Sequence, residues 1–323
     1  MANLFQKILL NFKYFNDAKG SAKESSLLGI DIRQNFIRVV ELAFIGKQLR
    51  YRLASCVNIA LEESFCDESL VTTLKQALRQ KEVKTKYAAV ALPHDVIAFK
   101  ELQVVVGLSS KEMQEFLRFN FQEHIGEVGE AINFDYQVTE KHSDSNMLKI
   151  EAIAVKNKHI TRWLKLLRAA DLSPKIIDID AYALERALRW QLPDMREHTI
   201  AINIEHGQVL VIVLGKERLL YMHSATYGHK PSSTEQMLDL IDEIMLQTQA
   251  ALRQHLHHLV LGGEMVTAVL ATAASNRFNI RVDVARPLLN MEVSDYLSRE
   301  EIEHLAPLMM IGVGLALRIG DIF

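Results

Sequence analysis

The feature that most constrains the fold is a strand–turn–strand pattern that occurs twice, once in each half of the 323-residue chain. In the first copy, apolar residues 27–32 lead through a polar turn into β-branched residues 36–42. In the second copy, residues 201–207 lead into residues 208–214, and a further strand pattern follows each copy. Such runs on either side of a polar turn are typical of β-hairpins. One such unit in each half predicts two related lobes that face each other.

A polar residue interrupts the first strand of each hairpin. Asp31 stands in an otherwise apolar run, and Asn203 occupies the equivalent place in the second copy. A carboxylate without a partner is rarely buried, because losing its hydration is costly. Asp31 therefore either caps the turn or lies at the mouth of the strand and faces a ligand.

The two hairpins, followed by the sequence Leu-Val-Leu-Gly-Gly at residues 259–263, resemble the actin/Hsp70/sugar-kinase superfamily. Three further stretches, residues 132–136, 177–184 and 307–318, follow in an order similar to that of the type IV pilus assembly protein family PilM. That family is related to the division protein FtsA, to MshI-like proteins and to the cytoplasmic domain of GspL. The resemblance covers roughly residues 26–320. It implies an α/β fold of the bilobal actin-like ATPase type, with two ribonuclease-H-like lobes.

The chain pattern and this resemblance together predict four parts. They are an amphipathic tail and linker (1–26), a first lobe (27–98 plus 156–197), an inserted strand-helix-strand-strand subdomain (99–155) and a second lobe (198–323). In the tail, apolar residues recur at helical spacing beside Lys7 and Lys13. Such a helix lies on a membrane interface or docks on a partner, whereas the alternatives are a flexible tail or packing on its own domain. Near the end of the chain, Gly312 and Gly314 predict a helix that approaches neighbouring backbone closely.

The resemblance implies that both hairpins bind the phosphates of a nucleotide and that the Gly-Gly turn lies against the adenosine. The nucleotide-binding candidates are therefore Asp31, Arg33, Asn203, Gly262 and Gly263. Glycine at such turns lets backbone N–H groups approach the phosphates, and aspartate holds the metal ion through water.

Three departures weaken this predicted phosphate site. Arg33 and Glu205 stand where the superfamily has glycine, and Asn203 replaces an aspartate. Asn203 binds a divalent cation less well, and Glu205 would repel a phosphate. Arg33 could compensate as a phosphate ligand. We expect weak binding of Mg-ATP, no required cofactor and no efficient hydrolysis, so the chain is not predicted to be an enzyme and has no catalytic candidate.

The sequence also predicts no metal site. Asp178 and Asp180 are too few for a magnesium site, and we expect Asp180 to cap the helix that follows. The histidines at 255, 257 and 258 lack the spacing of zinc ligands.

The resemblance assigns partner binding to the insert. The candidate groove residues are Phe99, which begins a strand beside the first lobe, and Phe119, which falls outside the apolar stripe of its helix. Phe119 is read either as an ordinary, partly buried residue or as a residue that faces a partner. The implied partner is the cytoplasmic N-terminal peptide of a PilN-type inner-membrane protein, and the pilus assembly ATPase and self-association are further candidates. The alternatives are an ATP-binding filament former like FtsA and a sugar kinase.

Composition limits the other function classes. The net charge of −3 does not favour nucleic acid as a partner. Two cysteines are too few for a disulfide framework, which favours a reducing compartment. The longest apolar run, residues 306–317, is shorter than the roughly 20 residues that a membrane span needs. We therefore expect a cytoplasmic scaffold that is only peripheral to the inner membrane.

Overall fold

The computed structural model describes residues 25–45, 50–61, 66–124, 131–141, 146–195, 198–228, 231–295 and 297–322. The expected amphipathic segment lies almost entirely within residues 1–24, outside the described residues. Its helical structure and its docking therefore stay predictions.

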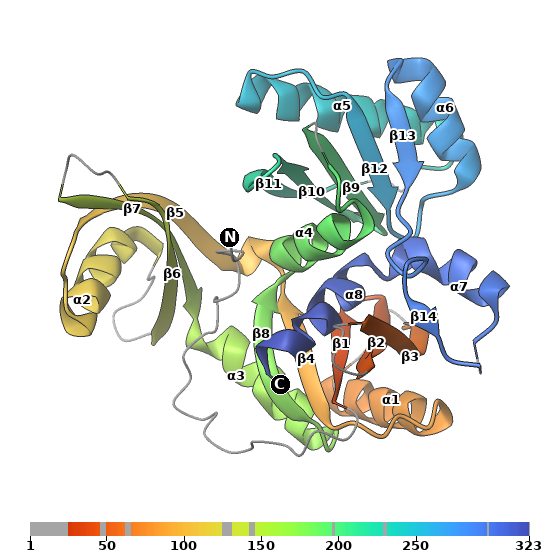
Figure 1. Ribbon diagram of the computed structural model, residues 1–323, viewed down its shortest axis with the longest axis horizontal. Helices are drawn as coiled ribbons and strands as arrows, with labels where there is room; N and C mark the ends of the chain where they lie inside the picture. Colours follow the sequence, from red (N-terminus) through yellow and green to blue (C-terminus); the bar gives the residue numbers. More distant parts are fainter. Residues whose placement is uncertain are drawn as a thin grey trace.

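The first copy of the repeated hairpin forms the centre of a sheet in the first lobe (Figure 1). Strands β1 and β2 pair antiparallel, with Asp31 opposite Arg38, and β3 continues the meander. On the other side of β1, strands β4 and β8 add in parallel. The sheet order is β14-β3-β2-β1-β4-β8. The bounds are β1 Ser26–Ile32, β2 Phe36–Ile45, β3 Arg50–Ala60, β4 Tyr87–Leu92, β8 Ser173–Ile179 and β14 Glu292–Val293.

The second copy of the hairpin forms the centre of the second sheet, with Asn203 opposite Leu210. Its order, β11-β10-β9-β12-β13, repeats the order of strands β3, β2, β1, β4 and β8 in the first sheet. The strand directions also repeat, because β12 and β13 add in parallel beside β9. This repetition confirms the two related lobes predicted from the sequence. The bounds are β9 Thr199–Glu205, β10 Gln208–Leu214, β11 Leu219–Thr226, β12 His258–Gly262 and β13 Arg281–Val284.

Helices cover both faces of each sheet. Alternating apolar side chains on each strand let one face pack outward and the other inward. The outer face of the first sheet packs on α1 and α3, and the outer face of the second sheet packs on α5 and α6. The bounds are α1 Asp67–Gln80, α3 Asn157–Ala169, α5 Thr234–Leu252 and α6 Ala268–Phe278.

Two helices, α4 (Asp180–Gln191) and α8 (Met310–Ala316), lie between the lobes. One hydrophobic core contains side chains from both helices and from the inner faces of both sheets. A Cβ atom on Gly314 would lie only 1.8 Å from the carbonyl oxygen of Ala183, which confirms the close backbone approach expected of this helix. The lobes are therefore joined by a continuous apolar contact.

The end of the chain packs on the first lobe, although we expected residues 198–323 to form the second. Strand β14 pairs in parallel with β3, and α8 contacts β1 and β2. The short 3₁₀ segment η5 (Leu317–Asp321) also contacts β1 and β2. Every residue of α8 is buried, so this helix needs apolar surface on all sides, and the space between the two sheets provides it. The preceding helix is α7 (Arg299–Leu305).

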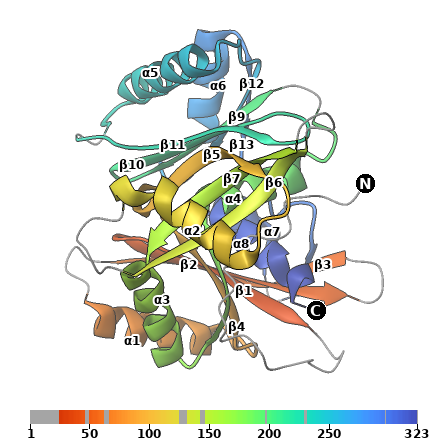
Figure 2. The same cartoon turned by 90° about the vertical axis from the view of Figure 1, so that its left-hand side faces the viewer.

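The insert forms a separate sheet of order β5-β7-β6, which is antiparallel throughout. Helix α2 packs on one face of this sheet, and Figure 2 shows it on the outer side of the molecule. Ser109 is the N-cap of this helix and forms a capping box with Glu112. The strand-helix-strand-strand order agrees with the sequence analysis. The bounds are η2 His94–Val96, β5 Ile97–Val105, α2 Ser110–Asn120, β6 Ile132–Lys141 and β7 Met147–Lys156.

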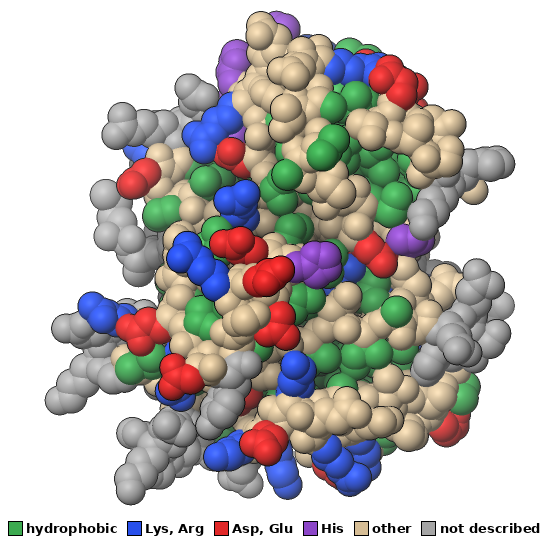
Figure 3. All heavy atoms as spheres, turned by 90° about the vertical axis from the view of Figure 1, so that its right-hand side faces the viewer, with side chains coloured by type: hydrophobic (Ala, Val, Ile, Leu, Met, Phe, Trp, Pro, Cys, Tyr) green, Lys and Arg blue, Asp and Glu red, His purple; other side chains and the backbone are tan. Residues whose placement is uncertain are grey.

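On the face turned away from the insert, acidic and basic side chains are interspersed with apolar ones (Figure 3). Within the described residues, no single helix has the length and apolar character of a membrane span. The bent pair Arg299–Leu308 and Met310–Asp321, with an angle of 95° between its halves, meets the criteria of length and composition only as a pair.

Candidate functional site

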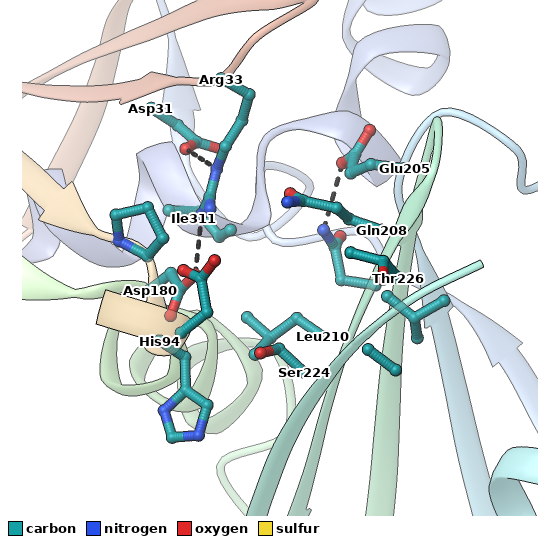
Figure 4. A pocket seen from close by; sticks show the side chains of 15 residues that line it. Asp31, Arg33, His94, Asp180, Glu205, Gln208, Leu210, Ser224, Thr226 and Ile311 are labelled. Atoms are coloured by element: carbon teal, nitrogen blue, oxygen red, sulfur yellow. Dashed lines mark hydrogen bonds and ion pairs between the residues drawn. The ribbon is translucent and has the colours of Figure 1, made fainter. Parts of the chain in front are cut away.

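A cavity of about 260 Å³ lies between the lobes, where the turns of the two hairpins approach each other (Figure 4). Of the predicted nucleotide-binding residues, Asp31, Arg33 and Asn203 line it. Gly262 and Gly263 are not among the described residues that line it. The other lining residues come mainly from η2, the start of α4, and strands β10 and β11: Pro93, His94, Asp95, Asp180, Glu205, Gln208, Val209, Leu210, Ser224, Ala225, Thr226 and Ile311.

Arg33 lies between two buried carboxylates, as Figure 4 shows. Its Nε donates to Oδ1 of Asp31 at 2.9 Å, and its Nη2 donates to Oδ2 of Asp180 at 3.0 Å. Burial opposes the charge of Arg33, but Asp31 and Asp180 outweigh it and raise the pKa of the guanidinium. Burial raises the pKa of Asp180, because the buried carboxylate loses hydration, and Arg33 opposes that rise only in part. Nε and Nη2 of the guanidinium are thus engaged by carboxylates of the protein.

Glu205, at the end of β9, forms an ion pair across the lobes with Arg38 of β2. Both guanidinium Nη atoms donate to it, at 2.5 Å to Oε1 and 2.8 Å to Oε2. Arg38 is 1% exposed, and it also donates to Asn58 and to the carbonyl oxygen of Leu308. The Nδ2 of Asn203 donates to Oε1 of Glu205 at 3.1 Å. The carboxylate predicted to repel a phosphate is therefore neutralised by the opposite lobe.

The Gly-Gly turn is explained by packing within the second lobe. Gly263 has φ +98°, and a Cβ atom there would lie 2.2 Å from the carbonyl oxygen of Ile204. The N–H of Gly263 donates to the carbonyl oxygen of Pro307 at 2.8 Å. A Cβ atom on Gly262 would lie 3.1 Å from Oδ1 of Asn203. A side chain at Gly263 would thus break contacts that hold β9 against β12, whether or not a nucleoside binds nearby.

The cavity does not fit a magnesium–phosphate group. Its carboxylates are Asp31, Asp95, Asp180 and Glu205, and its cationic lining residue, Arg33, is already paired. Burial lowers the pKa of the remaining basic side chain, His94, so this histidine adds little positive charge near neutral pH. Within the described residues, no group of three or more histidine, cysteine or carboxylate side chains could hold a metal ion. A guanidinium occupies the space between the two carboxylates that could have bound one.

Sequence reasoning missed two residues of this site. Arg38 was not singled out, although a charged residue within an apolar strand needs a buried partner, and Glu205 was available in the other hairpin. Asp180 was expected only to cap α4. Its Oδ1 does accept from the N–H of Ala181 at 2.7 Å, while its Oδ2 reaches Arg33.

The two candidate groove residues lie on opposite sides of the insert. Phe99 packs against the core shared by the lobes, on the face of the insert sheet away from α2. Phe119 is 70% exposed on α2 itself. One groove therefore cannot be lined by both side chains.

A comparison with models of known protein families shows to which family this chain belongs. Residues 29–242 match the model of the family described as type IV pilus assembly protein PilM, which is well over half of the chain. The chain belongs to the PilM family of type IV pilus assembly proteins.

Solved structures show the same fold as this PilM family member. A chain of a structure described as the PilM-PilN type IV pilus biogenesis complex superimposes with a TM-score of 0.76 at 16% sequence identity. The match covers 91% of this chain and 98% of that one. The ethanolamine utilization protein EutJ from Carboxydothermus hydrogenoformans gives a TM-score of 0.51 at 12% identity, covering 92% of this chain and 90% of that one. The predicted bilobal actin-like fold is confirmed.

Proposed function

We propose that this PilM family member is a scaffold of pilus assembly whose interlobe cleft is held together by its own side chains, without a required nucleotide. The observation that carries this proposal is the internal neutralisation of both hairpins. Arg33 is held by Asp31 and Asp180, and Glu205 is held by Arg38. A phosphate entering the cleft would have to displace these pairs and meet their carboxylates.

We propose further that the chain binds the N-terminal segment of a PilN-type inner-membrane protein from the cytoplasmic side. Family membership and the likeness to a chain from a PilM-PilN complex support this proposal. An extended segment that is ordered on binding gives modest affinity, because the ordering entropy offsets part of the contact energy. The filament-forming and sugar-kinase alternatives both need a nucleotide in the cleft, and the paired charges there disfavour them.

The face of the insert sheet away from α2 is the surface that we propose for this segment, and we call it the inner face. It carries Phe99 and Glu101 on β5 and Lys149 and Glu151 on β7. Phe99 is partly buried, whereas Glu101 is exposed. Phe99 could pack against an apolar side chain of a short peptide, and Glu101 would lie at the solvent-exposed rim of the interface.

The test is a fluorescence anisotropy titration of the full chain with a labelled peptide of the first ~15 residues of a PilN-type protein from the same organism. The Glu101→Trp variant places a bulky group at an exposed position of the inner face and is expected to weaken binding at least tenfold. The Phe119→Ser variant changes the opposite side of the insert and is expected to bind like the wild type. If the wild type does not bind, the partner proposal fails. Equal binding by Glu101→Trp would place the segment elsewhere.

A further inference from the structure

We propose that the partner segment presents a lysine or arginine side chain, and that its cationic group binds between Asp135 of β6 and Glu151 of β7, beside Tyr182 of α4. The inference rests on the proposed partner binding and adds the chemistry that the inner face recognises. In Figure 1, the insert sheet lies between α2 and the rest of the molecule.

The strand register places both carboxylates on the inner face. Ile153 of β7 is opposite Phe99 on β5 and opposite Asp135 on β6, so these residues lie in one row across the sheet. Glu151 is opposite Gln137 in the next row, which makes Asp135 and Glu151 diagonal neighbours. Diagonal neighbours across an antiparallel pair lie about 7–8 Å apart, a spacing that one ammonium or guanidinium group can bridge.

These two carboxylates differ from the others nearby because they lack a cationic partner. Around them, five ion pairs join Asp178 to Arg186 and Arg318, Glu185 to Arg189, Glu101 to Lys149, and Glu140 to Arg218. Within the part of the chain that the structure describes, Asp135 and Glu151 form no ion pair. Glu151 accepts a hydrogen bond from Nε2 of Gln137 at 2.6 Å, and Oδ2 of Asp135 is buried without any hydrogen-bond partner.

Tyr182 of α4 belongs to the same hydrophobic core as Ile153 of the inner face. Tyr182 is 6% exposed. Burial raises its pKa, and the charges of Glu151, Glu185, Asp178 and Asp135 raise it further. The phenol is therefore neutral, and its oxygen can accept a hydrogen bond from a cationic N–H group. The buried atom without a partner is Oδ2 of Asp135, and a ligand that donates a hydrogen bond to it would recover the cost of its lost hydration.

The electrostatics of the inner face favour a cation over an anion. Burial raises the pKa of Asp135 to about 7 and also raises that of Glu151. Arg318 opposes the rise in the pKa of Asp135, and Arg218 and Lys149 oppose the rise in the pKa of Glu151. These cations do not cancel the effect of burial. A further cation would stabilise both ionised carboxylates, whereas a phosphate or carboxylate of the partner would meet repulsion.

The experiment replaces each lysine by norleucine and each arginine by citrulline, one at a time, in the partner peptide. Binding to the full chain is measured at pH 8. One substitution is expected to weaken binding at least tenfold. The same substitution is expected to have less than a twofold effect on the Asp135→Asn/Glu151→Gln double variant, which removes the charges at nearly constant side-chain volume. The Glu115→Gln variant, which changes an exposed carboxylate on α2, serves as the matched control and should respond like the wild type.

The outcomes separate this inference from the proposed function. A parent peptide that does not bind the wild type overturns both. A parent peptide that binds, while every neutral replacement binds equally well, overturns only the cation site. An equal loss for the wild type and the double variant also overturns it, because the basic side chain would then bind elsewhere. For the parent peptide, we expect affinity for the wild type to rise between pH 6 and pH 8, and the double variant should lose this dependence.

Discussion

At the scale of single residues, the account depends on the buried ion pair between Arg38 and Glu205. Each side chain comes from a different lobe, and each satisfies hydrogen bonds of the other. The guanidinium also lies over the ring of Phe36, with 3.7 Å between its carbon and the ring centroid. Removing one partner of such a pair leaves the other buried and uncompensated, which costs about 3–5 kcal/mol.

We therefore predict that Arg38→Met lowers the free energy of unfolding by about 3 kcal/mol. Adding Glu205→Met is expected to restore most of this loss, because the second change removes the uncompensated charge. Urea denaturation of the two single variants and the double variant measures the coupling. Additive losses in the double variant would show that the pair does not link the lobes.

Residues at this scale were only partly predictable. Asp31 and Asn203 were identifiable because polar residues interrupt apolar strands at equivalent places in a repeat. The partner of each charge was not identifiable, because Arg33 meets Asp180 across 147 positions and Arg38 meets Glu205 across 167. A pattern in one strand says that a charge needs a partner, but only the fold selects that partner.

At the scale of secondary-structure elements, glycines set how closely α8 can approach its neighbours. We predict that Gly314→Ala lowers the free energy of unfolding by about 3 kcal/mol, because the new Cβ would meet the backbone carbonyl of Ala183. Gly228→Ala is the matched control, since nothing lies within 4 Å of a Cβ atom there. Thermal melting of both variants checks the prediction. Equal melting temperatures would mean that α8 can shift without cost.

The burial of Asp135 in the insert should make the stability of the folded chain depend on pH. The folded chain holds a proton on this carboxyl up to about pH 7, whereas the unfolded chain releases it near its ordinary pKa. The folded state is therefore favoured by this group at low pH, and the contribution is lost as the pH rises through about 7. Asp135→Asn is expected to melt at least about 2 °C above the wild type at pH 8 and at the same temperature at pH 4. Melting curves that differ equally at both pH values would contradict the shift.

Elements were more predictable than their assignment to lobes. The insert has its expected order of elements, because amphipathic periodicity and turn residues are local signals. The position of α8 is not a local property. A wholly apolar helix indicates burial but not which sheet buries it, and here it lies between both.

At the scale of the whole molecule, the lobes are connected by the two central helices and by the ion pair between Arg38 and Glu205. We propose that a nucleotide changes this arrangement little, because a ligand shifts a conformational equilibrium only by its differential affinity for the two states. We predict that calorimetric titration with Mg-ATP shows no binding tighter than high micromolar. A sub-micromolar dissociation constant, or steady hydrolysis that Asp31→Ala abolishes, would contradict the proposed scaffold.

The most direct test of the scaffold proposal is the affinity of the PilN-type segment for the full chain, measured by anisotropy with and without millimolar Mg-ATP. The account predicts the same dissociation constant within about twofold, because Arg33 and Arg38 are already paired with carboxylates of the cleft. A change of tenfold or more on adding Mg-ATP would correspond to about 1.4 kcal/mol of coupling and would contradict a nucleotide-independent scaffold.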